Sequence, residues 1–203
     1  MGYPGEPFSQ NKKGFQLIPD KIYQYVEISC VRMSDGDIEP LKLYGSEIPP
    51  NAKIKLFKDD IIVSKVRPYR GAIGIIDSDD YVGSSAFTVL KYKGSINKEA
   101  LITILRIKPY LQLSLKFNTG TSYPTITDND VLTLPIPLIP TGIQEEIKQK
   151  ISEMYRAKSA SKKLLDIARR SVELAINRSE EEAVKWLTDE ERQIIEASFV
   201  SKS

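Results

Sequence analysis

The feature that most constrains this chain is a long helical repeat in its C-terminal third. Apolar residues recur there at intervals of three and four, the spacing that places side chains on one face of an α-helix. The repeat begins after Thr141-Gly142 and reaches about residue 177, so an unbroken helix would contain about 36 residues and measure about 54 Å. Such length is typical of a coiled coil. The residues of this stripe are Ile143, Ile147, Ile151, Met154, Leu165, Ala168, Val172 and Ala175.

The stripe has two interpretations: it packs against the rest of the chain, or it forms a seam for a partner helix. A body built from the preceding 140 or so residues would have a radius of gyration of about 14 Å, and a helix of this length outruns it. This mismatch favours a partner seam. Lys158 and Ser161 interrupt the stripe, which argues against a strict zipper along the whole length.

The segments on either side of the long helix have their own signals. Pro135, Pro137 and Pro140 precede it, and because proline disfavours helix at the residue before it, residues 131–139 are predicted to be extended. Thr141 is then a candidate N-cap. Beyond Asn177, two capping boxes begin at Ser179 and Thr188 and predict two short helices that separate near Leu187.

The first 140 residues mix strand and helix signals. Alternating or continuous apolar runs predict strands over 23–31, 53–57, 61–66, 72–76 and 87–92, with a loop over 77–85. The period changes over 97–107, where Asn97 can cap a helix. The predicted class is α+β, a mixed α/β body followed by a long coiled-coil-type helix and short helices. The domains are a flexible lead-in (1–21), the body (22–140), the long helix (141–178) and the short C-terminal helices (179–203).

Composition excludes several kinds of chemistry. The 203 residues include no histidine and one cysteine, which removes Ser-His-Asp and Cys-His catalysis and any zinc site that uses histidine. The sequence also lacks the common glycine-rich phosphate loops and any apolar run long enough to cross a membrane. We therefore expect a cytoplasmic protein that holds no cofactor, and in which catalysis would require carboxylate, lysine or tyrosine chemistry.

Two basic or polar turns have the residue types of a DNA-binding surface. KVRPYRG (65–71) crowds three cations and a tyrosine into one turn, where they could contact phosphates or guanine edges; the alternative is a solvated hairpin turn. NTGTSYPT (118–125) offers hydroxyl and amide groups; the alternative is a loop in which Tyr123 packs inward on Pro124. The candidate DNA contacts are Lys65, Arg67, Tyr69, Arg70, Lys91, Lys93, Ser122 and Tyr123.

Two acidic stretches leave an enzymatic alternative open. DSDDY (77–81) and DNDV (128–131) could hold a divalent metal, as a small nuclease using Asp77, Asp79 or Asp128 would require. Neither stretch has the ligand spacing of a calcium loop, and solvated turns explain both. A third hypothesis is a scaffold protein whose long helix only oligomerises.

Three segments in this order resemble one half of the DNA-specificity subunit of type I restriction–modification systems. They are KDDIIVSKVRPYRGAIGII (58–76), GSSAFTVLKYKGSINKEALITIL (83–105) and TGTSYPTITDNDVLTLPIPLIPTGIQEEIKQKI (119–151). The resemblance covers about residues 22–178. In its last motif, Pro135, Pro137, Gln144 and Ile147 fall where the family places them. A family member normally has two recognition domains and two spacer helices, whereas this chain has one of each, so the resemblance implies a fragment or a half-subunit.

The resemblance implies a reader of double-stranded DNA without catalytic chemistry of its own. In that family each recognition domain reads one part of a split site, and the spacer helices set the distance between the two parts. Methyltransferase subunits, which hold S-adenosylmethionine, dock on these helices, and the restriction subunit joins the assembly. For a half-subunit we expect a two-fold dimer through residues 143–176 that reads inverted half-sites, with no role for a membrane.

Overall fold

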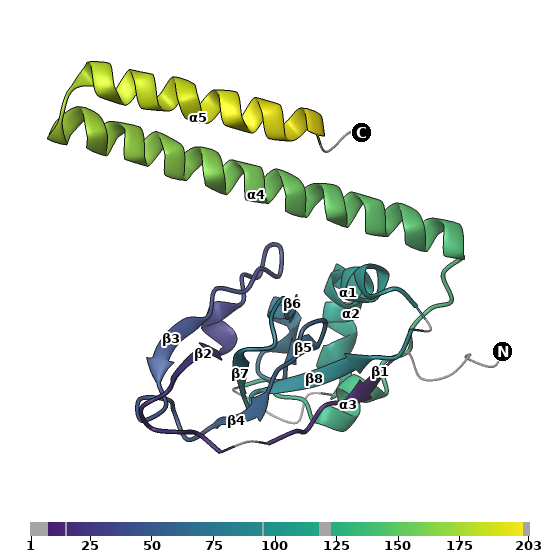
Figure 1. Cartoon of the computed structure of the whole chain (residues 1–203). Helices are drawn as coiled ribbons and strands as arrows, with labels where there is room; N and C mark the ends of the chain where they lie inside the picture. Colours follow the sequence, from purple (N-terminus) through teal and green to yellow (C-terminus); the bar gives the residue numbers. More distant parts are fainter. Residues whose placement is uncertain (1–7, 15, 95, 118–122, 201–203) are drawn as a thin grey trace. The chain divides into compact units, whose positions relative to one another are not determined.

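The computed structural model describes residues 8–14, 16–94, 96–117 and 123–200 (Figure 1). The chain divides into two compact units, Met1–Lys148 and Gln149–Ser203. The first unit contains two four-stranded sheets and three short α-helices, and the second is helical. This combination confirms the predicted α+β class. No helix in the described residues is long and apolar enough to cross a membrane.

The first sheet is antiparallel and lies at the centre of the first unit. Its order is β1 (Phe8–Gln10), β8 (Phe87–Tyr92), β5 (Ile61–Ser64) and β6 (Ile73–Ile75). Successive side chains of β5 point to opposite faces, and every residue of β5 is buried. Ile61 and Val63 pack in the cluster that contains α1 (Lys98–Arg106), while Ile62 packs in the cluster with the second sheet. The first sheet is thus covered on both faces.

The second sheet has the order β3 (Leu41–Tyr44), β2 (Ile22–Val26), β7 (Tyr81–Ser84) and β4 (Ala52–Lys55). β2 and β7 are parallel, with Gln24 opposite Tyr81. The prediction of a loop over 77–85 is therefore wrong in part, because residues 81–84 form an inner, fully buried strand. A side chain at Gly83 would stand 3.1 Å from Leu56, so this glycine permits close packing. β3 was not predicted.

The helices of the first unit follow local capping signals. The side chain of Asn97 accepts a hydrogen bond from the N–H of Ala100 at 2.7 Å, which confirms it as the N-cap of α1. The ambiguous segment after it forms α2 (Lys108–Leu113), with proline in its first turn, and a 3-10 helix, η3 (Ser114–Phe117). Residues 128–132, predicted as a turn, form α3 (Asp128–Leu132), which Thr127 and Asp130 cap reciprocally.

The proline-rich segment after α3 is extended and has no strand partner among the described residues. Alternate side chains enter the core over residues 134–137, since Leu134 and Ile136 are each 8% exposed while Pro135 and Pro137 are exposed; the alternation ends at Leu138, which is 66% exposed. The phenol of Tyr110 donates to the carbonyl of Pro135, a carbonyl that no ladder uses. The prediction of an extended segment is confirmed for residues 134–139 and is wrong for Val131 and Leu132, which form the end of α3. The carbonyl of Pro140 accepts from the N–H of Gln144 at 3.1 Å, so Thr141 is the first helical residue and not the cap.

The predicted flexible lead-in is ordered from Phe8 onward, in the parts that the structure describes. β1 pairs with β8 in the register Phe8 to Tyr92. The amide of Asn11 then donates to the carboxylate of Asp60 at 2.9 Å and to the carbonyl of Lys55 at 3.1 Å. These contacts attach the N-terminal strand to both sheets.

The predicted long helix is one continuous element, α4 (Thr141–Asn177), of 37 residues. Its first two turns belong to the first unit, and the remainder lies in the second. The two short helices expected after it are instead a single helix, α5 (Glu180–Val200), which runs back along α4 (Figure 1). Ser179 caps α5 as predicted, accepting from the N–H of Glu182 at 3.2 Å. The Thr188 hydroxyl donates to the Val184 carbonyl one turn earlier, so it does not cap a second helix.

Candidate nucleic-acid interface

The turn after β5 has an unusual backbone that places two arginines. Arg67 adopts a left-handed conformation with φ of 47°, and Pro68–Arg70 follow as a 3-10 helix, η2, that ends at Gly71 with φ of 76°. A left-handed arginine is strained unless its surroundings fix it. The N–H of Arg67 donates to the carbonyl of Pro124 at 2.7 Å, and its own carbonyl accepts from Arg70 at 2.9 Å. The turn is therefore held in a single shape.

The same contacts bring the two predicted DNA-binding turns together. Val66 forms an antiparallel bridge with Thr125, and the N–H of Ile126 donates to the carbonyl of Lys65 at 3.0 Å. As a result the guanidinium of Arg67 lies 4.3 Å from the centre of the Tyr123 ring. This is a cation–π contact, and the Tyr123 side chain remains 53% exposed. Tyr123 therefore does not pack inward, which was the alternative interpretation of this loop.

Arg67, Arg70 and Tyr123 line a cleft with a volume of about 450 Å³. The cleft lies beyond the carboxyl ends of the parallel strands β2 and β7, which supply Glu27, Ser29 and Ser84 to its lining. Its apolar lining consists of Ile28, Val31, Met33, Val66, Ala72 and Ala86. A concave surface that combines cations, hydroxyls and apolar groups has the chemical groups that read base edges in a DNA groove.

The charge left available at the cleft is positive. Neither Arg67 nor Arg70 forms an ion pair or a side-chain hydrogen bond among the described residues, so both guanidiniums keep their donors available. The carboxylate of Glu27, by contrast, accepts from the Ser29 hydroxyl at 2.5 Å and from the backbone of Cys30. Two arginines and one glutamate in the lining leave the cleft with a net positive charge.

A comparison with protein families assigns the chain. The model of the type I restriction modification DNA specificity domain matches residues 7–167. The chain belongs to this family. Among solved structures, the HsdS subunit from Thermoanaerobacter tengcongensis matches at 25% identity with a TM-score of 0.58, covering 77% of this chain and 42% of that chain.

A second solved structure extends the comparison. It concerns complex assembly and conformational transition of the type I R-M system, and it matches at 29% identity with a TM-score of 0.58, covering 77% of this chain and 41% of that chain. The specificity domain described here thus spans less than half the length of either match. No curated protein matches the sequence.

The remaining candidate DNA contacts of the specificity domain lie in different places. Lys65 is beneath the turn, where its ammonium pairs with Asp128 at 3.0 Å. Tyr69 is 38% exposed within η2. Because β8 runs antiparallel to β5, with Ser64 opposite Phe87 and Ile61 opposite Leu90, Lys91 and Lys93 lie beyond the far end of the ladder. The structure does not bring them to the cleft. Ser122 lies outside the described residues.

The carboxylates of the nuclease alternative are occupied by structural contacts. Asp128 accepts from Lys65 and from the Thr88 hydroxyl at 2.8 Å. Asp79 accepts from the N–H of Lys58 at 2.8 Å. Asp77 accepts a hydrogen bond from the phenol of Tyr81. Burial, with a further contribution from this acceptor, raises the pKa of Tyr81 to about 12. The described residues contain no group of three potential metal ligands, and nothing in them favours a nuclease.

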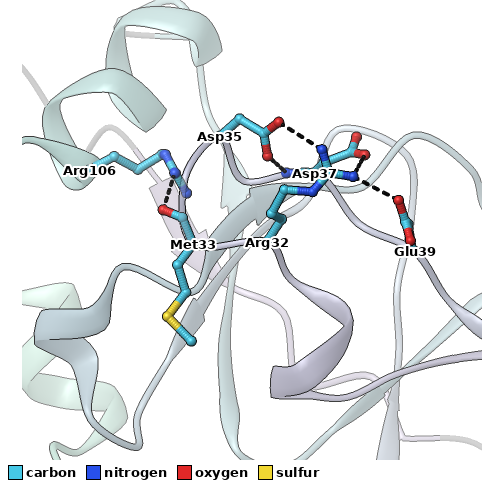
Figure 2. A network of polar contacts seen from close by, with 6 residues as sticks. All are labelled: Arg32, Met33, Asp35, Asp37, Glu39 and Arg106. Atoms are coloured by element: carbon cyan, nitrogen blue, oxygen red, sulfur yellow. Dashed lines mark hydrogen bonds and ion pairs between the residues drawn. The ribbon is translucent and has the colours of Figure 1, made fainter. Parts of the chain in front are cut away.

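Two residues beside the cleft were missed by sequence reasoning. Met33 lines the cleft and is 50% exposed, and Arg106, at the end of α1, donates to the carbonyl of Met33 at 2.9 Å (Figure 2). The sequence around Met33 indicates only a turn at Ser34-Asp35-Gly36. No local pattern predicts a contact between positions separated by 73 residues.

The predicted stripe of α4 is open along most of the specificity domain's helical unit. Leu165 is 70% exposed and Val172 is 58% exposed. At 3.6 residues per turn, Ile167, Arg170 and Leu174 lie on the opposite side of the helix. That side is the one that α5 covers: the Arg170 guanidinium lies 5.3 Å from the centre of the Trp186 ring, and Ile167 and Leu174 are half-buried.

The other stripe positions divide by location. Ile147 packs against the core of the first unit, next to Gln144, whose side chain accepts from the N–H of Asn97 at 2.8 Å and donates to Ile139 at 2.8 Å. Ile143 is 49% exposed. Ile151 and Met154 are half-buried, and Ala168 and Ala175 are exposed. Gln144 and Ile147 therefore anchor the start of α4, and the predicted partner seam would begin after them.

Proposed function

We propose that this specificity domain reads one half of a bipartite DNA site, as the non-catalytic specificity subunit of a type I restriction–modification system in the cytoplasm. The observation that carries the proposal is the Arg67 guanidinium held over the Tyr123 ring at the rim of an otherwise uncommitted cleft. Arginine reads guanine through two parallel hydrogen bonds in the major groove. A fixed backbone and a stacked ring hold this guanidinium in place before DNA arrives, which lowers the entropy lost on binding.

The helical unit is the part of the chain that binds the protein partners. Methyltransferase subunits dock on α4 and α5, and the restriction subunit joins through them. Two copies of the chain pair through the open stripe of α4, which would bring two recognition domains together. The exposed Leu165 and Val172, on the face that α5 leaves uncovered, support this pairing.

The test is a binding measurement on the full chain together with its methyltransferase subunits. Fluorescence anisotropy after selection from random bipartite duplexes should yield a preferred sequence. Arg67→Ala and Arg70→Ala should each weaken binding to it by about tenfold or more and relax the preference at one base pair. Lys42→Ala, in β3 at the other end of the second sheet, is the matched control and should change little. Equal losses for all three variants would contradict base reading at the cleft.

A further inference from the structure

The loop that carries Met33 is rigid by its own contacts. Arg32 pairs with Asp35 at 3.2 Å, with Asp37 at 3.2 Å and with Glu39 at 2.7 Å (Figure 2). The loop is closed by a bridge between Val31 and Ile38 and by a hydrogen bond from the N–H of Arg32 to the carbonyl of Asp37 at 2.8 Å. One arginine thus gathers the three carboxylates of the loop on one side.

Arg106 fastens this loop to the arginine turn. Its guanidinium donates to the carbonyls of Gly71 at 3.0 Å, Ile73 at 2.6 Å and Met33 at 2.9 Å. Gly36 leaves room for it, since a side chain there would stand 2.7 Å from the guanidinium. The Met33 backbone is therefore fixed relative to the turn that bears Arg67 and Arg70, by a residue that belongs to neither loop.

The Met33 side chain points away from the three carboxylates (Figure 2) and into the cleft lining. Single exposed apolar residues are common on protein surfaces and need no explanation. Ile22 and Tyr44, which face each other across β2 and β3, are exposed apolar residues of this kind. Met33 differs from them because it continues the apolar lining formed by Ile28 and Val31 and lines the same cleft as two guanidiniums that form no ion pair among the described residues.

We propose that Met33 is a base-reading residue that contacts the 5-methyl group of a thymine, and that Arg106 is the positioning residue that holds it there. The inference rests on the proposed DNA-reading function. In the major groove the thymine methyl is the only apolar group among the base edges, and an apolar side chain is what recognises it. A thioether has no charge and adapts its shape, so it can meet a methyl between the polar contacts of Arg67 and Arg70.

Deoxyuridine substitution isolates this contact, because deoxyuridine lacks the methyl group and pairs as thymine does. The full chain with its methyltransferase subunits is first given its selected half-site, and each thymine is then replaced in turn. The unaltered protein should lose affinity about three- to fivefold at one position, the effect of one buried methyl. Met33→Ala should bind thymine DNA about as weakly as the unaltered protein binds deoxyuridine DNA, with no further loss on replacement. Met33→Leu should retain the discrimination.

Arg106→Lys tests the positioning role, because lysine keeps the charge and cannot span three carbonyls. The ratio of its affinities for thymine DNA and deoxyuridine DNA at that position should fall to about one. If Arg106 only stabilised the fold, the substitution would lower the unfolding temperature and leave this affinity ratio unchanged. Failure of the unaltered complex to prefer any sequence would remove the proposed function itself. A selected half-site without thymine, or ratios identical in the unaltered protein and Met33→Ala at every thymine, would overturn this inference alone.

Discussion

Two aspartates in the first unit show how local partners decide the effect of a charge. Asp60 is 2% exposed, and burial raises its pKa although Asn11 and Phe57 donate hydrogen bonds to it. Burial also acts to raise the pKa of Asp128, but hydrogen bonds from Thr88, Lys65 and Gln10 outweigh it, and the net shift is downward. The contributions of the two carboxylates to folding stability therefore change with pH in opposite directions.

Replacing each of these aspartates with asparagine should reveal the opposite pH dependences of stability. The lowered pKa means that Asp128 contributes stability above the unfolded-state value of about 4, and that this contribution disappears as pH falls through the folded-state pKa. Asp128→Asn should cost about 1 kcal/mol at pH 7 and progressively less as the pH falls below about 4. The raised pKa of Asp60 makes its contribution greatest at low pH, so Asp60→Asn should gain relative to the unaltered protein as pH rises.

Denaturant unfolding from pH 3 to pH 7 measures both differences. The Lys65→Met background is the control for Asp128, because the penalty of Asp128→Asn should decrease once the ammonium is gone and retain only the part due to Thr88 and Gln10. A penalty of unchanged size in that background, or one that grows toward acid pH, would show that the ion pair does not hold the turn.

At the scale of elements, α5 determines which face of α4 is available. Its buried residue Ala183 and its half-buried residues Trp186, Leu187 and Glu190 have the spacing of one helix face. That face meets the Arg170 side of α4. On the other side, Leu165 and Val172 of the stripe are exposed in this single chain, and exposed apolar area of this kind marks an interaction surface.

Leu165→Asp should separate the paired chains without unfolding the helix. Leu165 is 70% exposed within the chain, so the substitution leaves few internal contacts to lose, whereas a charge in a helix seam is strongly unfavourable. Sedimentation at micromolar concentration should change from dimer to monomer, with the same helical circular dichroism. Ser159→Asp, an exposed position off the stripe, adds the same charge and should leave the dimer intact. A monomer before any substitution would contradict the pairing.

At the scale of the whole molecule, the length of α4 should set the spacing between two half-sites. Seven residues inserted between Lys150 and Ile151 would add about 10 Å of helix while keeping the stripe nearly in register. If two chains pair antiparallel, each head moves outward by that length, so the optimum spacing between inverted half-sites should increase by about six base pairs. Binding to duplexes of graded spacing measures this, with an insertion in the loop near Gly94 as control. An unchanged optimum would exclude α4 as the spacer.

How far the sequence predicts this molecule depends on whether the determinants are local. The helix of residues 141–177, the Asn97 cap and the extended prolines follow from neighbouring residues, and they were predicted. The strand at 81–84 was missed because it has four residues flanked by aspartates, glycine and serine, which resemble a loop; its burial comes from contacts with β2 and β4. α5 was divided at Thr188 because a hydroxyl that can cap can equally bond the preceding turn.

The cleft also could be predicted only where its determinants are local in the sequence. The residue types of the turns at 65–71 and 118–125 indicated a DNA-binding surface, and the structure brings Arg67 and Tyr123 together through the Val66 bridge to Thr125. The distribution of the other cations could not be foreseen, because the register of β5 with β8 decides that Lys91 lies far from this turn. Met33 and Arg106 needed three-dimensional contacts to be noticed.

The bridge between Val66 and Thr125 joins positions far apart in the sequence, and it has a consequence for damaged variants. β8, α1 and α2 lie between the two halves of the proposed DNA-contacting rim in the sequence, so the rim exists only in the folded unit. A substitution that weakens the interior should therefore lower the fraction of binding-competent molecules without changing the affinity of each folded molecule. Because unfolding is an equilibrium, titrations of such variants would reach the same amplitude with a midpoint raised in inverse proportion to the folded fraction.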